Sequence, residues 1–68
     1  MEHFAKRLND LIEDGDLSRK ELAERIGVNP RQITRWTVNE AEPTIEKLKA
    51  ICEIYRVSAD DLLGLSGL

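Results

Sequence analysis

The feature that most restricts how this chain can fold is a connection of only three residues, Gly27, Val28 and Asn29, between two short segments of helical pattern. So short a connection forces the two helices to cross closely. Gly27 tolerates the positive φ that a tight turn needs, and Ala23 has a side chain small enough for the crossing point. The sequence therefore predicts a closely packed pair of helices within residues 18–38.

The second helix of this pair divides into an apolar and a polar face. At 100° per residue, Ile33 and Trp36 fall on the inward side of the helix. An apolar seam between the two helices is completed by Leu22, Ile26 and Val28. The opposite face carries Arg31, Thr34, Arg35 and Val38. Because two arginines lie one turn apart on this exposed face, we expect it to enter a groove of a binding partner.

Capping patterns mark where the helices begin. Ser18 can accept a hydrogen bond from the amide of Glu21 while the Glu21 side chain reaches back, which is a complete capping box. Similar signals occur at Asn29 with Pro30 and Gln32, at Thr44, and at Ser58 with Asp61. Together with a first helix over residues 2–14, these four starts predict five helices.

Apolar residues recur at helical spacing in the first and fourth of these helices. The first helix carries Phe4, Leu8, Leu11 and Ile12 on one face, and Gly15 is expected to end it in a left-handed conformation. The fourth carries one stripe of Ile45, Leu48, Ile51, Cys52 and Tyr55. No alternating strand pattern or hairpin dipeptide occurs. The predicted fold class is therefore all-α, a compact five-helix bundle.

The length of the chain limits it to one domain, and we expect residues 1–68 to form that domain. Its 41% hydrophobic and 34% charged residues are typical of a soluble globular protein. No apolar run approaches the roughly 20 residues that span a bilayer, and the first residues lack the pattern of a signal peptide. We therefore expect a cytoplasmic protein with no membrane contact and no enclosed site for a small-molecule ligand.

Charge is distributed unevenly along the chain, although the net charge is only −3. Residues 1–18 carry two basic and five acidic side chains, and residues 39–68 carry three basic and six acidic ones. Residues 19–38 reverse this balance, with five basic and two acidic side chains. Short charged runs usually only keep a helix face in solvent, so the position of the arginines on the paired helices must decide their role.

The stretch LSRKELAERIGVNPRQITRW, followed by EPTIEKLKAICEIYRVSADDLLG, resembles the phage-repressor and Cro-type helix-turn-helix family, also called the XRE family. The resemblance covers nearly all of the chain. It implies a lambda-repressor-like DNA-binding domain whose helix-turn-helix, at about residues 18–38, places its second helix in the major groove of double-stranded DNA. It also implies a homodimer that reads a palindromic operator as a transcriptional regulator, here interpreted as a repressor.

Carried over onto this sequence, the resemblance assigns base contacts and phosphate contacts to different residues. The implied base contacts are Arg31, Gln32, Thr34 and Arg35. The implied phosphate contacts are Ser18, Arg19, Lys20 and Asn39. Arginine can bind guanine O6 and N7 together, and glutamine can pair with adenine. The first group would therefore set specificity, and the second would fix the register on the duplex.

Three positions depart from the residues that are common in the family. Arg19 stands where glutamine is frequent, which keeps affinity for phosphate but puts in doubt the family's side-chain bond to the second helix. Thr37 stands where glutamate is frequent and removes a common ion-pair partner. Asn39 replaces a frequent glycine but can still adopt a left-handed cap. The acidic loop at residues 40–42, basic in many relatives, predicts a reduced electrostatic affinity for DNA.

The remaining chemistry-bearing residues are interpreted as structural. Cys52 is expected to be a core residue, and His3 a solvated residue of a frayed terminus. One histidine and one cysteine do not make a closed zinc site. Asp60 and Asp61 fit helix capping better than acid-base catalysis. No metal, cofactor or enzymatic activity is therefore predicted.

Leucines near the C-terminus give a short domain more apolar surface than its core is expected to absorb. The predicted dimer interface consists of Leu62, Leu63, Leu65 and Leu68. An alternative function is a protein-binding module of the same fold, such as an antitoxin or a regulatory adaptor, which the acidic balance favours. The sequence fits a phage-type repressor, a restriction-modification controller or an antitoxin, and fits a whole chain or the N-terminal domain of a longer one.

Overall fold

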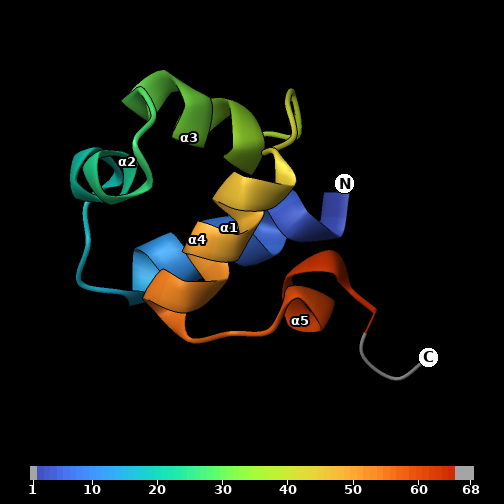
Figure 1. Ribbon diagram of the computed structural model, residues 1–68. Coiled ribbons are helices and arrows are strands. Elements are labelled where there is room, and N and C mark those ends of the chain that lie inside the picture. The colour runs from blue at the N-terminus through green and yellow to red at the C-terminus, as the bar shows by residue number, and fades with distance from the viewer. Residues whose placement is uncertain (1, 66–68) are drawn as a thin grey trace.

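The computed structural model describes residues 2–65, which form five α-helices with no strand in that range. The predicted all-α fold is therefore confirmed. Figure 1 shows the helices packed into one bundle, with α3 and α5 on opposite sides of it. Their bounds are α1 Glu2–Asp14, α2 Arg19–Ile26, α3 Pro30–Thr37, α4 Ile45–Tyr55 and α5 Ala59–Leu63.

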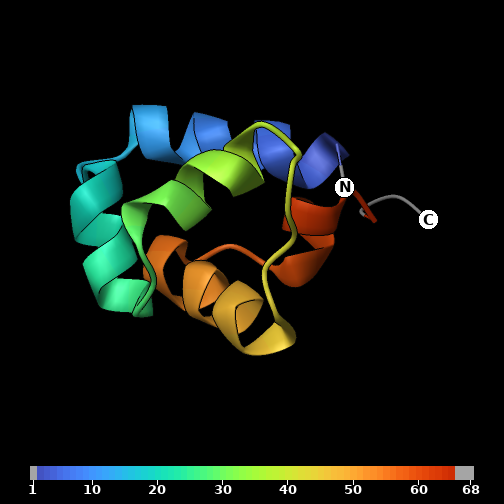
Figure 2. The same ribbon diagram turned by 90° about the horizontal axis from the view of Figure 1, so that it is seen from above.

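Every helix contributes at least one fully buried side chain to a single hydrophobic core. The largest of these side chains are Phe4, Leu8, Leu22, Ile33, Ile51 and Leu62. No polar or charged residue is buried between residues 2 and 65. Burial of an aliphatic or aromatic side chain of this size stabilises a fold by about 1.5–3 kcal/mol. In the view from above, α2 and α5 lie at opposite ends of the bundle, with α1 and α4 along its two long sides (Figure 2).

The predicted helix starts are present. Ser18 Oγ accepts from the Glu21 amide at 3.1 Å, and the Ser18 amide donates to Glu21 Oε1 at 3.1 Å, so both halves of the capping box form. The Asn29 side chain caps α3, but through the amide of Arg31 at 2.9 Å. Thr44 and Ser58 accept from the amides three residues ahead and so cap α4 and α5.

Two expectations about the helices are wrong. Gly15 ends α1 without the left-handed φ that Gly27 and Gly64 adopt. A side chain at position 15 would instead place its Cβ 2.8 Å from the carbonyl oxygen of Leu11 and 3.3 Å from the ring of Tyr55, so glycine is needed there for a close approach. Ile45, expected on the inward stripe of α4, is 86% exposed because it is the first residue of that helix and precedes the packed turns.

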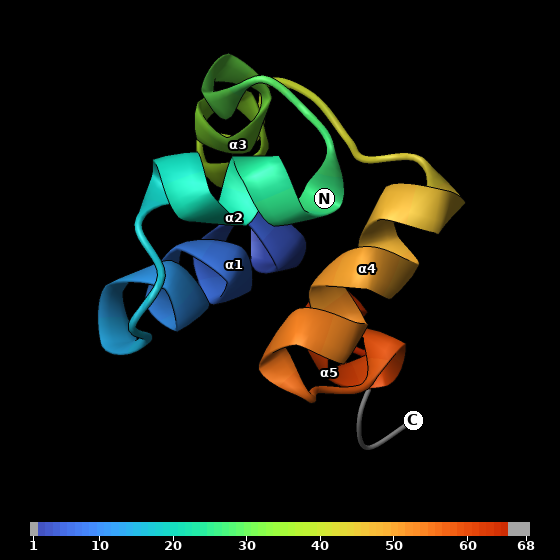
Figure 3. The ribbon, with the colours of Figure 1, turned by 60° about the vertical axis from the view of Figure 1, so that its left-hand side comes forward.

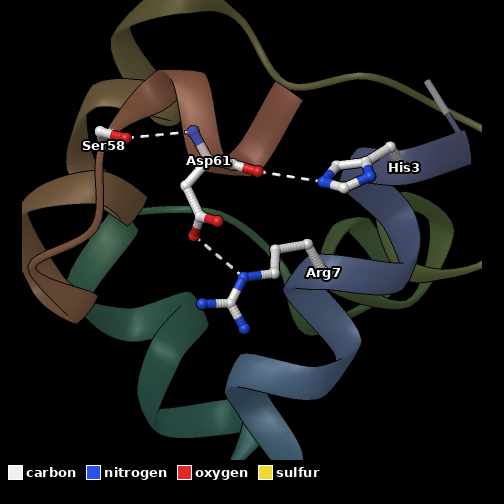
Figure 4. A network of polar contacts seen from close by, with 4 residues as sticks. All are labelled: His3, Arg7, Ser58 and Asp61. Atoms are coloured by element: carbon white, nitrogen blue, oxygen red, sulfur yellow. Dashed lines mark hydrogen bonds and ion pairs between the residues drawn. The ribbon is translucent and has the colours of Figure 1, made fainter. Parts of the chain in front are cut away.

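A polar contact joins the two ends of the described chain. His3 on α1 donates from Nε2 to the backbone carbonyl of Asp61 on α5 at 3.0 Å, and Arg7 donates from Nε to the Asp61 carboxylate at 2.9 Å (Figure 4). The His3 ring also lies so close to Gly64 that a Cβ there would be 2.8 Å from its Cγ. His3 is therefore held against α5, so the expectation of a frayed terminus is wrong, whereas the expected solvent exposure of its side chain is confirmed.

Candidate nucleic-acid interface

The candidate interface begins with the close crossing of α2 and α3. Gly27 has φ +87°, and its amide and that of Val28 both donate to the carbonyl of Ala23, at 2.8 and 3.0 Å. Ala23 is completely buried, as expected of the small residue at the crossing. Lys47 on α4 donates from Nζ to the Ile26 carbonyl at 3.2 Å, which gives the C-terminal end of α2 a charged partner. These contacts close the C-terminal end of α2, from which the short turn leads into α3.

The two faces of α3 differ as the helical period predicts. Ile33 is 0% and Trp36 3% exposed, and both belong to the core. Figure 3 shows α3 at the edge of the bundle, behind α2 and away from α5. Within the described range, no hydrogen bond or ion pair engages the side chains of the four predicted base-contact residues, all of which are exposed: Arg31, Gln32, Thr34 and Arg35. This face is available to a ligand.

Val38 extends the exposed face of α3 by one further residue. It caps the C-terminal end of the helix and is 56% exposed. The helical period predicts that Val38 shares a face with Thr34 and Arg35, although it is not among the predicted base contacts. Since an apolar side chain on such a face can contact the methyl group of thymine, Val38 is a further candidate contact.

The first turn of α2 carries three of the predicted phosphate contacts in different surroundings. Ser18 and Lys20 are exposed, and the amides of Arg19 and Lys20 have no acceptor among the described residues. The Arg19 side chain is half-buried, and its Nη2 donates to Asn9 Oδ1 on α1 at 3.0 Å. Sequence patterns such as caps and helical periods do not predict this contact, because it depends on how α1 and α2 are placed relative to each other.

The fourth predicted phosphate contact, Asn39, ends α3 in the expected left-handed conformation with φ +62°. The amide of Glu40 bonds back to the carbonyl of Arg35 at 2.9 Å and closes this helix end. Thr37 donates its hydroxyl to the Thr34 carbonyl at 2.8 Å, so the residue that replaces the family's ion-pair partner bonds within its own helix. Asn39 is exposed at the C-terminal end of α3.

The leucines predicted to form a dimer interface differ in how deeply they are buried. Leu62 is completely buried in the core and has no surface to offer a partner, so its assignment is corrected to a core residue. Leu63 is half-buried against the core, and Leu65 is 45% exposed. Leu68 lies outside the described residues. Within the described range, Leu63 and Leu65 are the members of this set that keep accessible apolar surface.

Other chemistry-bearing groups within residues 2–65 are part of the packing. Cys52 and Tyr55 are half-buried against the core, and burial raises the pKa of the Cys52 thiol. In the same range, no three histidine, cysteine or acidic side chains are grouped so that they could hold a metal ion. None of the helices from α1 to α5 is both long and apolar enough to cross a membrane.

The sequence of this chain is similar to those of known proteins. The sequence model of the family described as Helix-turn-helix matches residues 8–62. The HTH-type transcriptional activator BcrR of Enterococcus faecalis is 32% identical over 61 residues, which are 90% of this chain and 30% of that protein. The uncharacterized HTH-type transcriptional regulator YobD of Bacillus subtilis (strain 168) is 30% identical over 63 residues, which are 93% of this chain and 56% of that protein.

A solved structure agrees with these sequence relatives. The SOS-response transcriptional repressor LexA from Eubacterium rectale superposes with a TM-score of 0.81 at 29% identity, over 87% of this chain and 63% of that one. In each of these three comparisons the chain spans less than two thirds of the length of the protein that it matches.

Proposed function

This chain belongs to the phage-repressor and Cro-type (XRE) helix-turn-helix family of DNA-binding transcriptional regulators, and from that membership we propose that it recognises a specific double-stranded DNA sequence through the major groove. The observation that carries the proposal is that α3 has an exposed polar face opposite its buried apolar face. A single α-helix fits the major groove of B-DNA, where base edges can be distinguished. Residues 1–68 would act as one DNA-binding domain.

Different residues of this interface would contact the DNA bases and the DNA backbone. Arg31 and Arg35 lie one turn apart and can each bind guanine O6 and N7, while Gln32 can pair with adenine. Thr34 offers a methyl group and a hydroxyl to the same groove. The backbone is held at the start of α2 and beyond α3, by Ser18, Arg19, Lys20 and Asn39. The free amides of the first turn of α2 favour an anion at that point.

A palindromic operator and a homodimer complete the proposal. Two copies that associate near Leu63, Leu65 and Leu68 would place their α3 helices in half-sites about 34 Å apart. We propose repression as the sign of regulation, because a DNA-bound dimer can exclude polymerase from a promoter without any further contact. The relatives do not share one sign, since BcrR is named an activator and LexA a repressor.

Selection from a randomised duplex library tests the partner and its symmetry together. We expect a palindrome, and a recovered sequence without two-fold symmetry would contradict the dimeric arrangement.

On the selected duplex, Arg31→Ala or Arg35→Ala should weaken binding by about 1–3 kcal/mol with little effect on random DNA. Arg19→Ala should weaken binding to both duplexes by similar factors and make the slope of log affinity against log salt shallower by roughly one per subunit. Equal losses on both duplexes for Arg31 and Arg35 would reassign them to the backbone.

A protein-binding module of the same fold is the second candidate function. The exposed Glu40 in the loop after α3, in a chain of net charge −3, favours it because this loop would repel a phosphate backbone. Such a module would bind no duplex at low salt yet retain a protein partner. Failure to recover any DNA in the selection, with the partner still bound, would establish this alternative.

A further inference from the structure

Arg19 is the one predicted DNA contact in the described range whose side chain is already held by another helix. It is the first residue of α2, and its Nη2 atom donates to Oδ1 of Asn9, ten residues earlier on α1, at 3.0 Å. Because Asn9 lies on α1 and Arg19 at the start of α2, this hydrogen bond links two different helices. The position of the guanidinium is therefore set by tertiary packing.

We propose that Asn9 is a positioning residue for DNA binding: it fixes the Arg19 guanidinium at the N-terminal end of α2, ready to meet a phosphate of the DNA backbone. The inference rests on the proposed function, because it assigns a phosphate contact to Arg19. An arginine side chain that is already ordered loses less rotamer freedom when it binds than one that moves in solvent. Asn9 thereby lowers the cost of the contact without touching DNA itself.

The chemistry of the amide suits this role. Guanidinium has five N–H donors, and the bond to Asn9 uses one of them, so donors remain for a phosphate. The amide is also neutral, so it holds the arginine without cancelling the positive charge that attracts DNA. A carboxylate in the same place would hold the guanidinium more strongly but would neutralise it.

Tyr55 on α4 gives a second, independent indication of where the Arg19 guanidinium lies. Its hydroxyl is buried, and no hydrogen-bond partner for it exists within the described residues. Burial raises the pKa of Tyr55, and the positive charge of Arg19 acts in the opposite direction because it stabilises the phenolate. The Arg19 guanidinium, which Asn9 holds, therefore lies close enough to Tyr55 for its charge to act on the phenol. Since Tyr55 is the single tyrosine of the chain, its titration reports the placement of Arg19 independently of DNA.

A double-mutant cycle tests the proposal by fluorescence anisotropy on the selected duplex and a scrambled one, at several salt concentrations. Asn9→Ala should weaken binding to both duplexes by about 2- to 10-fold and leave the salt slope unchanged, because the charge remains while its order is lost. Asn9→Asp should weaken binding and also make the salt slope shallower, as Arg19→Ala does. In the Arg19→Ala background, Asn9→Ala should have no further effect.

Lys49→Gln is the matched control for Asn9→Asp, because it changes the net charge by the same amount at an exposed position of α4 outside the proposed interface.

Both Asn9→Ala and Arg19→Ala should raise the pKa of Tyr55, which can be measured by the absorbance of the tyrosinate. Independent losses for the two residues, parent-like affinity of Asn9→Ala, or a shallower slope in the control as large as that of Asn9→Asp would overturn the positioning role. If Arg19→Ala leaves binding unchanged, the phosphate contact of the proposed function fails and the positioning role fails with it, whatever Tyr55 reports.

Discussion

The α2–α3 and α1–α5 helix contacts of this bundle differ in the chemistry of the side chains that form them. The α2–α3 contact joins neighbours in sequence and is apolar, with Ala23 and Ile33 completely buried. The α1–α5 contact joins residues up to 58 positions apart, and beside the buried Leu62 it consists of polar bonds from His3 and Arg7 to Asp61. The first contact presents the exposed face of α3, and the second holds the C-terminal helix in place.

The difference teaches which contacts a short segment can specify alone. Within α2–α3, a tight turn and two apolar faces leave few alternative packings, and burial provides most of the stability. Within α1–α5, the ion pair is between side chains that are 34% and 40% exposed, so solvent screens it and it contributes little. The position of α5 therefore depends mainly on the burial of Leu62.

The largest expected effect breaks the apolar contact. Ile33→Asp would place an unpaired charge in a completely buried position and should destabilise the fold by about 4 kcal/mol or more. Ile45→Asp is the matched control, because Ile45 is 86% exposed at the start of α4, where an acidic residue is favourable. Far-UV circular dichroism with thermal melting should show loss of helix for the first variant only. A parent-like melting temperature for Ile33→Asp would show that the orientation of α3 is wrong.

The next effect compares the two left-handed glycines, one at each contact. Gly27→Ala should cost about 1–2 kcal/mol from its positive φ alone, since the nearest atom to the new Cβ would be Lys47 Nζ at 3.7 Å. Gly64→Ala has the same strain and a 2.8 Å approach to the His3 ring, so it should cost more. Denaturant titration measures both. His3→Ala should recover part of the loss in the Gly64 variant and none in the Gly27 variant; equal losses for both glycines would show that the ring does not pack there.

A smaller effect is expected from the ion pair of the α1–α5 contact. A cycle of Arg7→Gln and Asp61→Asn should give a coupling of about 0.2–1 kcal/mol, because both groups are partly exposed. The coupling should shrink as salt increases. Chemical unfolding of the four proteins at low and high salt provides the measurement. A coupling well above this range, unaffected by salt, would mean that the pair is far better shielded from solvent than its exposure indicates.

The smallest effect concerns the local polar contact at the start of α2. The hydrogen bond from the Ser18 amide, followed by that with the Ser18 side chain, holds the pKa of Glu21 below its ordinary value of 4.5. Because the folded-state pKa is lowered, this contribution to stability is present above about pH 4.5 and is lost as the pH falls through the folded value. Glu21→Gln removes the titration but keeps an acceptor. The stability difference between parent and variant should therefore decrease below pH 4.5, and a difference independent of pH would contradict the capping role.

The agreement between sequence and structure is best where the signal is local. Ser18, Thr44 and Ser58 cap helices as predicted, because a cap depends on residues only three positions apart. The exposed face of α3 follows from the helical period in the same way. Contact of that face with DNA stays a prediction, since the family membership supports DNA binding in general and assigns no individual residue.

By itself, the sequence determined the five helices, their starts and the division of α3 into a buried and an exposed face, because caps, turns and apolar periods act within a few residues. Only the tertiary structure decided that Leu62 belongs to the core, that His3 is held by Asp61 and that Arg19 is held by Asn9. Each of these depends on which side chains two helices bring together. That choice is made by the packing of the whole core, which no short stretch of sequence encodes.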